Sequence, residues 1–157
     1  MAGYDFSELT VLVVDDYKYM RTLLSEVMSA FGFREVLSAS DGQEAAELLR
    51  QQAVDVVFID WNMPNLDGIA FTQGVRNGAY GKDPYLPIVM VSGYTEEGRI
   101  VEALNAGVHS YVLKPVTPEA LGIRLSQIIE KPPRFIKTDS YFGPYRATHR
   151  PPTAEDW

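Results

Sequence analysis

Short apolar runs alternate along this chain with longer segments in which apolar residues recur at helical spacing. The run at 11–14 is too short for a helix and rich in β-branched valine, which favours a buried strand. The segment 20–31 places its apolar residues on one helix face, and Gly32 follows as a helix end. The same alternation predicts further strands at 35–39, 54–59, 87–91 and 111–113, and further helices at 41–49, from about 67, at 95–106 and at 118–129.

Five strand–helix units in strict alternation predict one α/β domain, which we place at 1–130. Its expected core is an open, doubly wound parallel sheet of five strands with helices on both faces. In such sheets a ligand binds outside the carboxyl ends of the strands. Polar residues that directly follow strands are therefore the first candidates for a functional site.

Five polar side chains occupy such positions. They are Asp15 and Asp16 after the first strand, Asp60 after the third, Ser92 after the fourth and Lys114 after the fifth. Each of them alone has an ordinary structural explanation, since an aspartate after a strand is often a helix N-cap or a turn residue. Their joint occurrence at the ends of four strands favours a shared site instead.

The chemistry of this set points to phosphoryl transfer. Three neighbouring carboxylates repel one another unless a cation compensates, and Mg²⁺ prefers oxygen ligands of this kind. The hydroxyl of Ser92 and the ammonium of Lys114 would then meet the outer phosphoryl oxygens. Phosphoryl transfer needs little beyond in-line positioning and charge neutralisation, which this set supplies.

Four segments carry a family resemblance: VLVVDDYKYMRTLL, VVFIDWNMPNLDGIAF, VMVSGY and SYVLKPVTPEAL. In order and spacing they resemble the receiver domains of bacterial two-component response regulators, and the CheY-like single-domain type in particular. The similarity extends over about residues 8–130. It implies a flavodoxin-like sheet with strand order 2-1-3-4-5 and a cytoplasmic signalling protein without a separate output domain.

The resemblance also implies a role for each acidic residue. Asp60 would accept a phosphoryl group from a histidine kinase or a histidine phosphotransfer protein. Asp15, Asp16 and Asp60, with the backbone carbonyl of Asn62, would hold Mg²⁺. Phosphatases with an aspartyl nucleophile usually carry a second carboxylate two residues later, where this chain has Asn62. We therefore expect no enzyme acting on foreign substrates, only catalysis of the protein's own phosphorylation and dephosphorylation.

Three further residues, Ser92, Lys114 and Tyr111, take roles from the same resemblance. Ser92 and Lys114 would contact the phosphoryl group, with Ser92 standing where the family more often has threonine. Tyr111 matches the aromatic switch position, which turns inward when the hydroxyl of Ser92 moves toward the phosphate; packing on a half-buried strand is the alternative. Tyr94, two residues after Ser92, is placed to shield the site and slow hydrolysis of the acyl phosphate.

Charge and composition limit the classes of partner that the protein can bind. Residues 1–130 hold 9 Lys/Arg against 18 Asp/Glu, a net charge of −9, and residues 131–157 hold 5 against 3, or +2. An acidic body disfavours nucleic-acid binding, and 131–157 is too short for a DNA-binding output domain, so we expect no direct DNA contact. No apolar run is long enough to span a membrane, and there is no cysteine. We expect a downstream protein target, and a monomer or a dimer that forms on phosphorylation.

The C-terminal tail, 131–157, is rich in proline, aromatic residues and arginine. One interpretation is an anion-binding arm; by resemblance to CheY-like regulators with arginine-rich extensions, its ligand would be a nucleotide second messenger such as cyclic di-GMP. The other is that the tail folds back on the receiver through about Phe142 and is disordered near its end. The candidate anion-binding residues are Arg134, Arg146 and Arg150.

Overall fold

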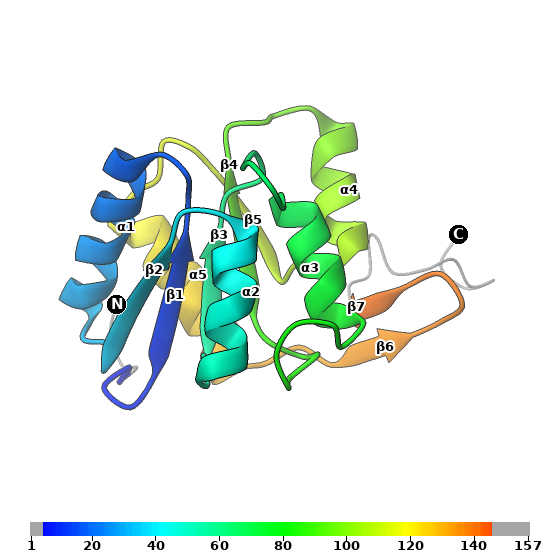
Figure 1. Ribbon diagram of the computed structural model, residues 1–157, viewed down its shortest axis with the longest axis horizontal. Helices are drawn as coiled ribbons and strands as arrows, with labels where there is room; N and C mark the ends of the chain where they lie inside the picture. Colours follow the sequence, from blue (N-terminus) through cyan, green and yellow to red (C-terminus); the bar gives the residue numbers. More distant parts are fainter. Residues whose placement is uncertain (1–4, 146–157) are drawn as a thin grey trace.

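The computed structural model describes residues 5–145, so Arg146 and Arg150 lie outside the described residues. Its centre is a five-stranded sheet in which every neighbouring pair is parallel (Figure 1). The observed order, β2-β1-β3-β4-β5, confirms the predicted doubly wound topology. The strands are β1 Thr10–Val14, β2 Glu35–Ala39, β3 Val56–Ile59, β4 Ile88–Ser92 and β5 Ser110–Leu113.

Five helices cover the two faces of this sheet. Buried residues of α1 and α5 pack with one set of strand side chains, and those of α2, α3 and α4 pack with the other set. Along β1, for example, Leu12 and Val14 face one layer while Val11 and Val13 face the other. A strand buried on both faces reads as an uninterrupted apolar run, which is why the sequence revealed it. The helices are α1 Lys18–Phe31, α2 Gly42–Gln51, α3 Gly68–Arg76, α4 Glu97–Ala106 and α5 Pro118–Glu130.

The predicted helix signals agree with the structure, with one exception. Asp41 and Thr117 cap α2 and α5 by accepting hydrogen bonds from backbone N–H groups at 2.8 and 3.1 Å. The helix predicted at 95–106 instead begins at Glu97. The carbonyl of Tyr94 accepts a hydrogen bond from the hydroxyl of Tyr111 (2.8 Å), and Glu96 is extended, so the first helical turn forms later than the pattern indicates.

The segment after α5 forms a small antiparallel hairpin, which the sequence analysis did not anticipate. Its strands are β6 Phe135–Lys137 and β7 Phe142–Pro144. Strands of three residues are too short to show an alternating pattern. Tyr141 is buried between them, and its hydroxyl donates to the carbonyl of Pro144 at 2.8 Å. A Cβ added at Gly143 would lie 3.0 Å from the Cα of Gly107, so the hairpin approaches the end of α4 backbone to backbone.

A buried arginine links the hairpin to the receiver. The guanidinium of Arg76 donates to the carbonyls of Gly107 and Pro84, both at 2.9 Å. Its Nη2 lies 3.2 Å from Nδ1 of His109, and the ring of Phe135 covers it at 5.0 Å. Burial lowers the pKa of Arg76 to about 10, so the group stays charged at neutral pH. The aromatic ring thus packs on a cation that backbone carbonyls already hold.

Among residues 5–145, no helix is both long and apolar enough to cross a membrane.

Removing the hairpin should lower the stability of the fold. A buried large side chain contributes roughly 1.5–3 kcal/mol, less the cost of ordering the chain. We expect a chain ending at Glu130 to melt several degrees lower than the full chain by circular dichroism, and a chain ending at Tyr145 to melt with the full chain. Gly143→Ala should act like the shorter truncation, because its Cβ would collide with Tyr141 and Gly107. Equal melting temperatures for all four proteins would contradict a stabilising hairpin.

Candidate functional site

Three carboxylates meet where β1 and β3 end. Asp15 and Asp16 lie in the loop after β1, and Asp60 directly follows β3. Asp15 is buried, Asp60 is half-buried and Asp16 is exposed. One carboxylate oxygen from each lies within 4.8 Å of the others. The fold therefore brings together the three acidic residues that the sequence placed at one edge of the sheet.

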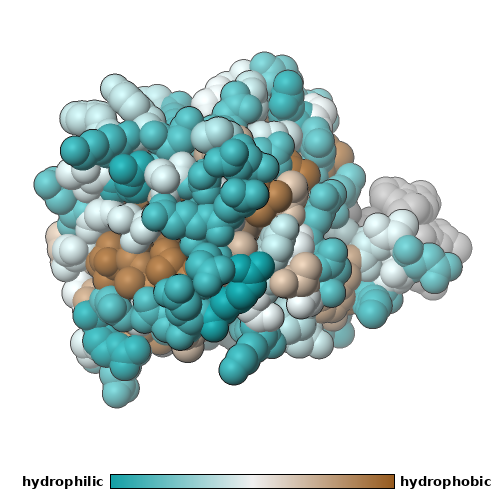
Figure 2. Space-filling view, in the orientation of Figure 1, coloured by the Kyte–Doolittle hydropathy of each residue, from teal (hydrophilic) through white to brown (hydrophobic). Residues whose placement is uncertain are grey.

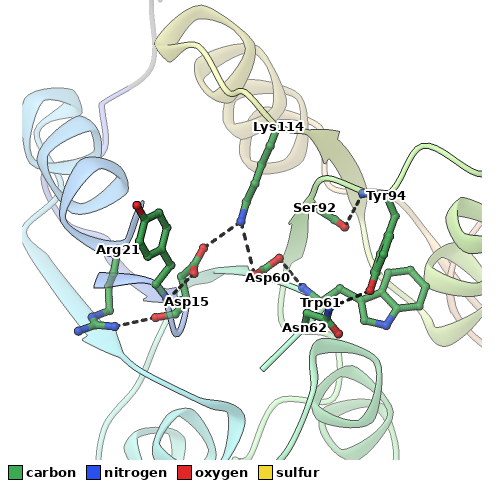
Figure 3. Close-up of polar contacts among 9 residues, drawn as sticks. Asp15, Arg21, Asp60, Trp61, Asn62, Ser92, Tyr94 and Lys114 are labelled. Atoms are coloured by element: carbon green, nitrogen blue, oxygen red, sulfur yellow. Dashed lines mark hydrogen bonds and ion pairs between the residues drawn. The ribbon is translucent and has the colours of Figure 1, made fainter. Parts of the chain in front are cut away.

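Lys114 reaches the same point from the end of β5. Its Nζ lies 3.3 Å from Oδ2 of Asp15 and 3.4 Å from Oδ2 of Asp60 (Figure 3). Its backbone N–H donates to the carbonyl of Ser92 at 2.9 Å, which continues the pairing of β4 and β5 to the site. The Lys114–Pro115 peptide bond is cis. A single ammonium thus faces two of the three carboxylates.

The loop after β1 is fixed by local hydrogen bonds. Oδ1 of Asp15 accepts from the backbone N–H of Tyr17 at 2.9 Å, and the carbonyl of Asp15 accepts from Arg21 at 2.7 Å. The N-cap of α1 is Tyr17, which makes no side-chain capping bond, so neither Asp15 nor Asp16 is the cap. The turn role and the site role coexist in Asp15, because one oxygen serves the turn and the other faces Lys114.

Asp60 sits in a tightly packed environment. Its backbone N–H donates to the carbonyl of Val14, and one carboxylate oxygen accepts from the backbone N–H of Trp61 at 2.8 Å. A Cβ at Gly68 would lie 2.5 Å from the carbonyl of Asp60, so only glycine allows α3 to start this close. Burial raises the pKa of Asp60; the charge of Lys114 opposes this shift and that of Asp15 adds to it.

Ser92 and Tyr111 occupy the neighbouring strand ends. Ser92 is buried, and its Oγ accepts from the backbone N–H of Tyr94 at 3.1 Å. The half-buried ring of Tyr111 turns toward the same loop, and its hydroxyl donates to the carbonyl of Tyr94 at 2.8 Å. Burial raises the pKa of Tyr111, which a hydrogen bond to Ser92 partly offsets, so its phenol remains a donor at neutral pH.

A cluster of two aromatic rings and a guanidinium stands beside Asp60. The hydroxyl of Tyr94 accepts from the side-chain amide of Asn62 at 2.8 Å, and its ring meets that of Trp61 edge to face at 5.4 Å. The guanidinium of Arg99 lies 4.2 Å from the centroid of Tyr94 and 5.3 Å from that of Trp61. Sequence reasoning missed Arg99, because an exposed arginine in a helix gives no signal that separates it from a solvated one.

The described part of the tail lies elsewhere. Together with α5, the hairpin borders a groove of about 250 Å³ near His109 and Ser110, before the amino end of β5 and opposite the edge that carries Lys114. Arg134 packs its guanidinium 5.1 Å from the ring of Tyr145, which lines this groove. The structure therefore does not bring Arg134 to the acidic site.

Comparison with known proteins agrees with this geometry. The sequence model of the family described as "Response regulator receiver domain" matches residues 11–126. The chain is 34% identical over 123 residues to the chemotaxis protein CheY of Pseudomonas aeruginosa, covering 78% of this chain and 98% of that protein. The hairpin follows the part that the family model matches.

Solved structures show the same fold. Chemotaxis protein CheY4 of Vibrio cholerae superposes with a TM-score of 0.71 at 30% identity, over 77% of this chain and 98% of that one. The receiver domain of a sensor histidine kinase of Pseudomonas aeruginosa, solved with a magnesium ion in its active-site cleft, also has a TM-score of 0.71, at 26% identity, over 79% and 99%. The chain accordingly belongs to the response regulator receiver domain family, as a CheY-like member with a role in two-component signalling.

Proposed function

We propose that the protein is a phosphorylation-dependent switch in a two-component phosphorelay. Asp60 accepts a phosphoryl group from a histidine kinase or a histidine phosphotransfer protein, and the phosphorylated form changes its binding to a downstream protein in the cytoplasm. The observation that carries this proposal is the meeting of Asp15, Asp16 and Asp60 with the ammonium of Lys114. A structural explanation of each residue alone does not account for four charged groups at one sheet edge.

The residues at this edge fit Mg²⁺. Three carboxylate oxygens within 4.8 Å are the hard ligands that this ion prefers, and one partly exposed side leaves room for water or a phosphoryl oxygen. Asp15, Asp16 and Asp60, with the backbone carbonyl of Asn62, would hold it. The ion would supply positive charge that offsets the repulsion of the carboxylates and of the incoming phosphoryl group.

Asp60 and Lys114 have different roles in the transfer of the phosphoryl group. An oxygen of Asp60 forms the new bond to phosphorus while the bond from phosphorus to the histidine nitrogen of the donor breaks, and that nitrogen takes up a proton. Lys114 neutralises part of the charge on the transferred group, because its Nζ already lies 3.4 Å from the acceptor carboxylate. Asp60 needs no general base, since it reacts as the carboxylate.

The readout uses the contacts around Ser92. Its hydroxyl would donate to the phosphoryl group while its oxygen still accepts from the backbone N–H of Tyr94, so movement of Ser92 toward the phosphate would pull on the loop that carries Tyr94. The loop that carries Tyr94 is also tied to the hydroxyl of Tyr111, so a shift of this loop changes the surface near β5. Partner binding, and dimerisation where it occurs, would respond to that surface.

A second candidate function is nucleotide sensing by the groove next to the hairpin. The described residues that line the groove include the cations Arg124 and Lys131 and the ring of Tyr145 but no carboxylate, in a chain with a net charge of −7. An anion with a planar base fits this lining, as a second messenger such as cyclic di-GMP would. This candidate is compatible with phosphorylation, since the groove lies at the opposite sheet edge.

Phosphorylation should be specific to Asp60 and require magnesium. With acetyl phosphate and Mg²⁺, intact-mass measurement should show one phosphoryl adduct on the parent protein and none on Asp60→Asn. Chelation of the metal should abolish labelling. An adduct that persists on Asp60→Asn would show that another residue is the acceptor.

Lys114→Ala should lose the conformational response to the phosphoryl group, even where Asp60 can still be phosphorylated. At a separation of about 4 Å in a partly exposed site, the interaction energy between an ammonium and an anion is roughly 1–4 kcal/mol. The variant loses this interaction. Beryllofluoride, which mimics the phosphoryl group, should slow hydrogen exchange in peptides covering Tyr94 and Tyr111 in the parent protein and in the remote Lys82→Ala control. In Lys114→Ala this protection should be lost. Equal protection in all three proteins would remove Lys114 from the switch.

The groove can be tested with cyclic di-GMP itself. Calorimetric titration should show binding to the full chain that weakens as salt rises, because the contacts would be charge-based. Lys131→Ala should weaken binding about tenfold or less, as expected for loss of one exposed charge contact, and a chain ending at Glu130 should not bind. The second candidate function would be rejected if the full chain gave no heat of binding, or if the chain ending at Glu130 still bound the nucleotide.

A further inference from the structure

We infer that Arg99 is a positioning residue that holds Tyr94 as a cover over the phosphorylation site and so lengthens the life of phosphorylated Asp60. The inference rests on the proposed function and goes beyond it, because it assigns the lifetime of the signal to a side chain of α4. Arg99 touches neither Asp60 nor Lys114 in any contact that the structure gives. It acts through the ring of Tyr94, over which its guanidinium lies at 4.2 Å.

The ring of Tyr94 is held on three sides. Its hydroxyl accepts from the amide of Asn62 at 2.8 Å, its edge contact with Trp61 has a centroid distance of 5.4 Å, and its face lies under Arg99. Asn62 and Trp61 are the two residues that follow Asp60 in the chain. Two of these three contacts therefore come from the strand end that carries the acceptor, and the third comes from the first turn of α4.

The backbone of Tyr94 is fixed as well. Its N–H donates to Oγ of Ser92 at 3.1 Å, and its carbonyl accepts from the hydroxyl of Tyr111 at 2.8 Å. The residue thus connects the two switch residues with the aromatic cluster. With the backbone anchored, the remaining freedom of Tyr94 is rotation of its side chain, and this is the motion that Arg99 restrains.

The cluster stands where it can screen the acyl phosphate. In Figure 3, Asp60 lies between Lys114 on one side and the rings of Trp61 and Tyr94 on the other. Trp61 is also tied to the acceptor directly, because its backbone N–H donates to Asp60 at 2.8 Å. Tyr94 is half-buried and Arg99 is exposed, so Arg99 is the solvent-facing member of this cluster.

Hydrolysis is the step that such a cover slows. A water oxygen attacks phosphorus, the bond between phosphorus and the Asp60 oxygen breaks, and the carboxylate is regenerated. The product leaves as dihydrogen phosphate, which keeps both protons of the water. The attacking water must approach phosphorus opposite the departing oxygen, so a ring fixed at the mouth of the site reduces the productive approaches. Without Arg99, Tyr94 loses one of its three restraints and opens more often.

The test measures the lifetime of the phosphorylated protein. Parent and variants are labelled with acetyl phosphate and Mg²⁺, the donor is removed, and the adduct is followed by intact mass. We expect loss of the adduct to be about two- to five-fold faster in Arg99→Ala, the change that corresponds to one exposed cation–π contact. Arg99→Lys, which keeps the charge without the planar group, should fall between. Lys82→Ala removes one positive charge at the opposite sheet edge and should decay like the parent.

A double variant separates positioning from a general effect of charge. Tyr94→Ala should decay at least as fast as Arg99→Ala, and Arg99→Ala combined with Tyr94→Ala should decay no faster than Tyr94→Ala alone, because Arg99 acts through the ring. Multiplying effects in the double variant, or an unchanged lifetime in Arg99→Ala, would overturn the inference. A parent protein that accepts no phosphoryl group would overturn the proposed function and this inference with it, which is a separate and recognisable result.

Discussion

Mutual repulsion among three carboxylates is the interaction on which the chemistry of this protein depends. Placing their oxygens within 4.8 Å costs free energy that a nearby opposite charge offsets, and within residues 5–145 the ion pairs to this group come from one ammonium, Lys114, against Asp15 and Asp60. The site therefore carries a deficit of positive charge. Under the proposed function, that deficit would favour binding of a hard dication, and the dication and Lys114 together would offset the charge of an incoming phosphoryl group.

The sheet provides the force that keeps this unfavourable cluster together. β1, β3 and β4 are buried throughout and packed by helices on both faces, so their carboxyl ends cannot move apart without opening the core. Gly68 shows how tight the arrangement is, since a single methyl group there would contact the carbonyl of Asp60 at 2.5 Å. Hydrophobic burial, spread over two layers, thus offsets a local electrostatic cost at one edge. The close approach of like charges at the functional edge is tolerated because the buried sheet holds the strand ends in place.

The sequence predicted those parts of the molecule whose pattern extends over many residues. Long apolar runs and capping residues such as Asp41 and Thr117 are local signals, and they located the strands, most helix ends and the polar residues at one edge. The late start of α4 escaped prediction, because it depends on the hydroxyl of Tyr111, a residue of another strand. The hairpin escaped because its strands have three residues, and Arg99 escaped because an exposed arginine in a helix gives no signal that separates it from a solvated one. Tertiary contacts decided each of these cases.

Helix α4 connects two of the features that the sequence did not reveal, the hairpin and the contact of Arg99 with Tyr94. Its first turn carries Arg99, which packs on Tyr94 beside the acceptor, and its end at Gly107 lies against Gly143 of the hairpin. A helix is stiff over ten residues, so the hairpin and the aromatic cluster rest on the two ends of one rigid element. A ligand or partner that binds the hairpin can influence the site only if the contact differs between two positions of this helix. The hairpin therefore packs against α4, the same helix that carries Arg99 and through which the lifetime of the phosphorylated form would be adjusted.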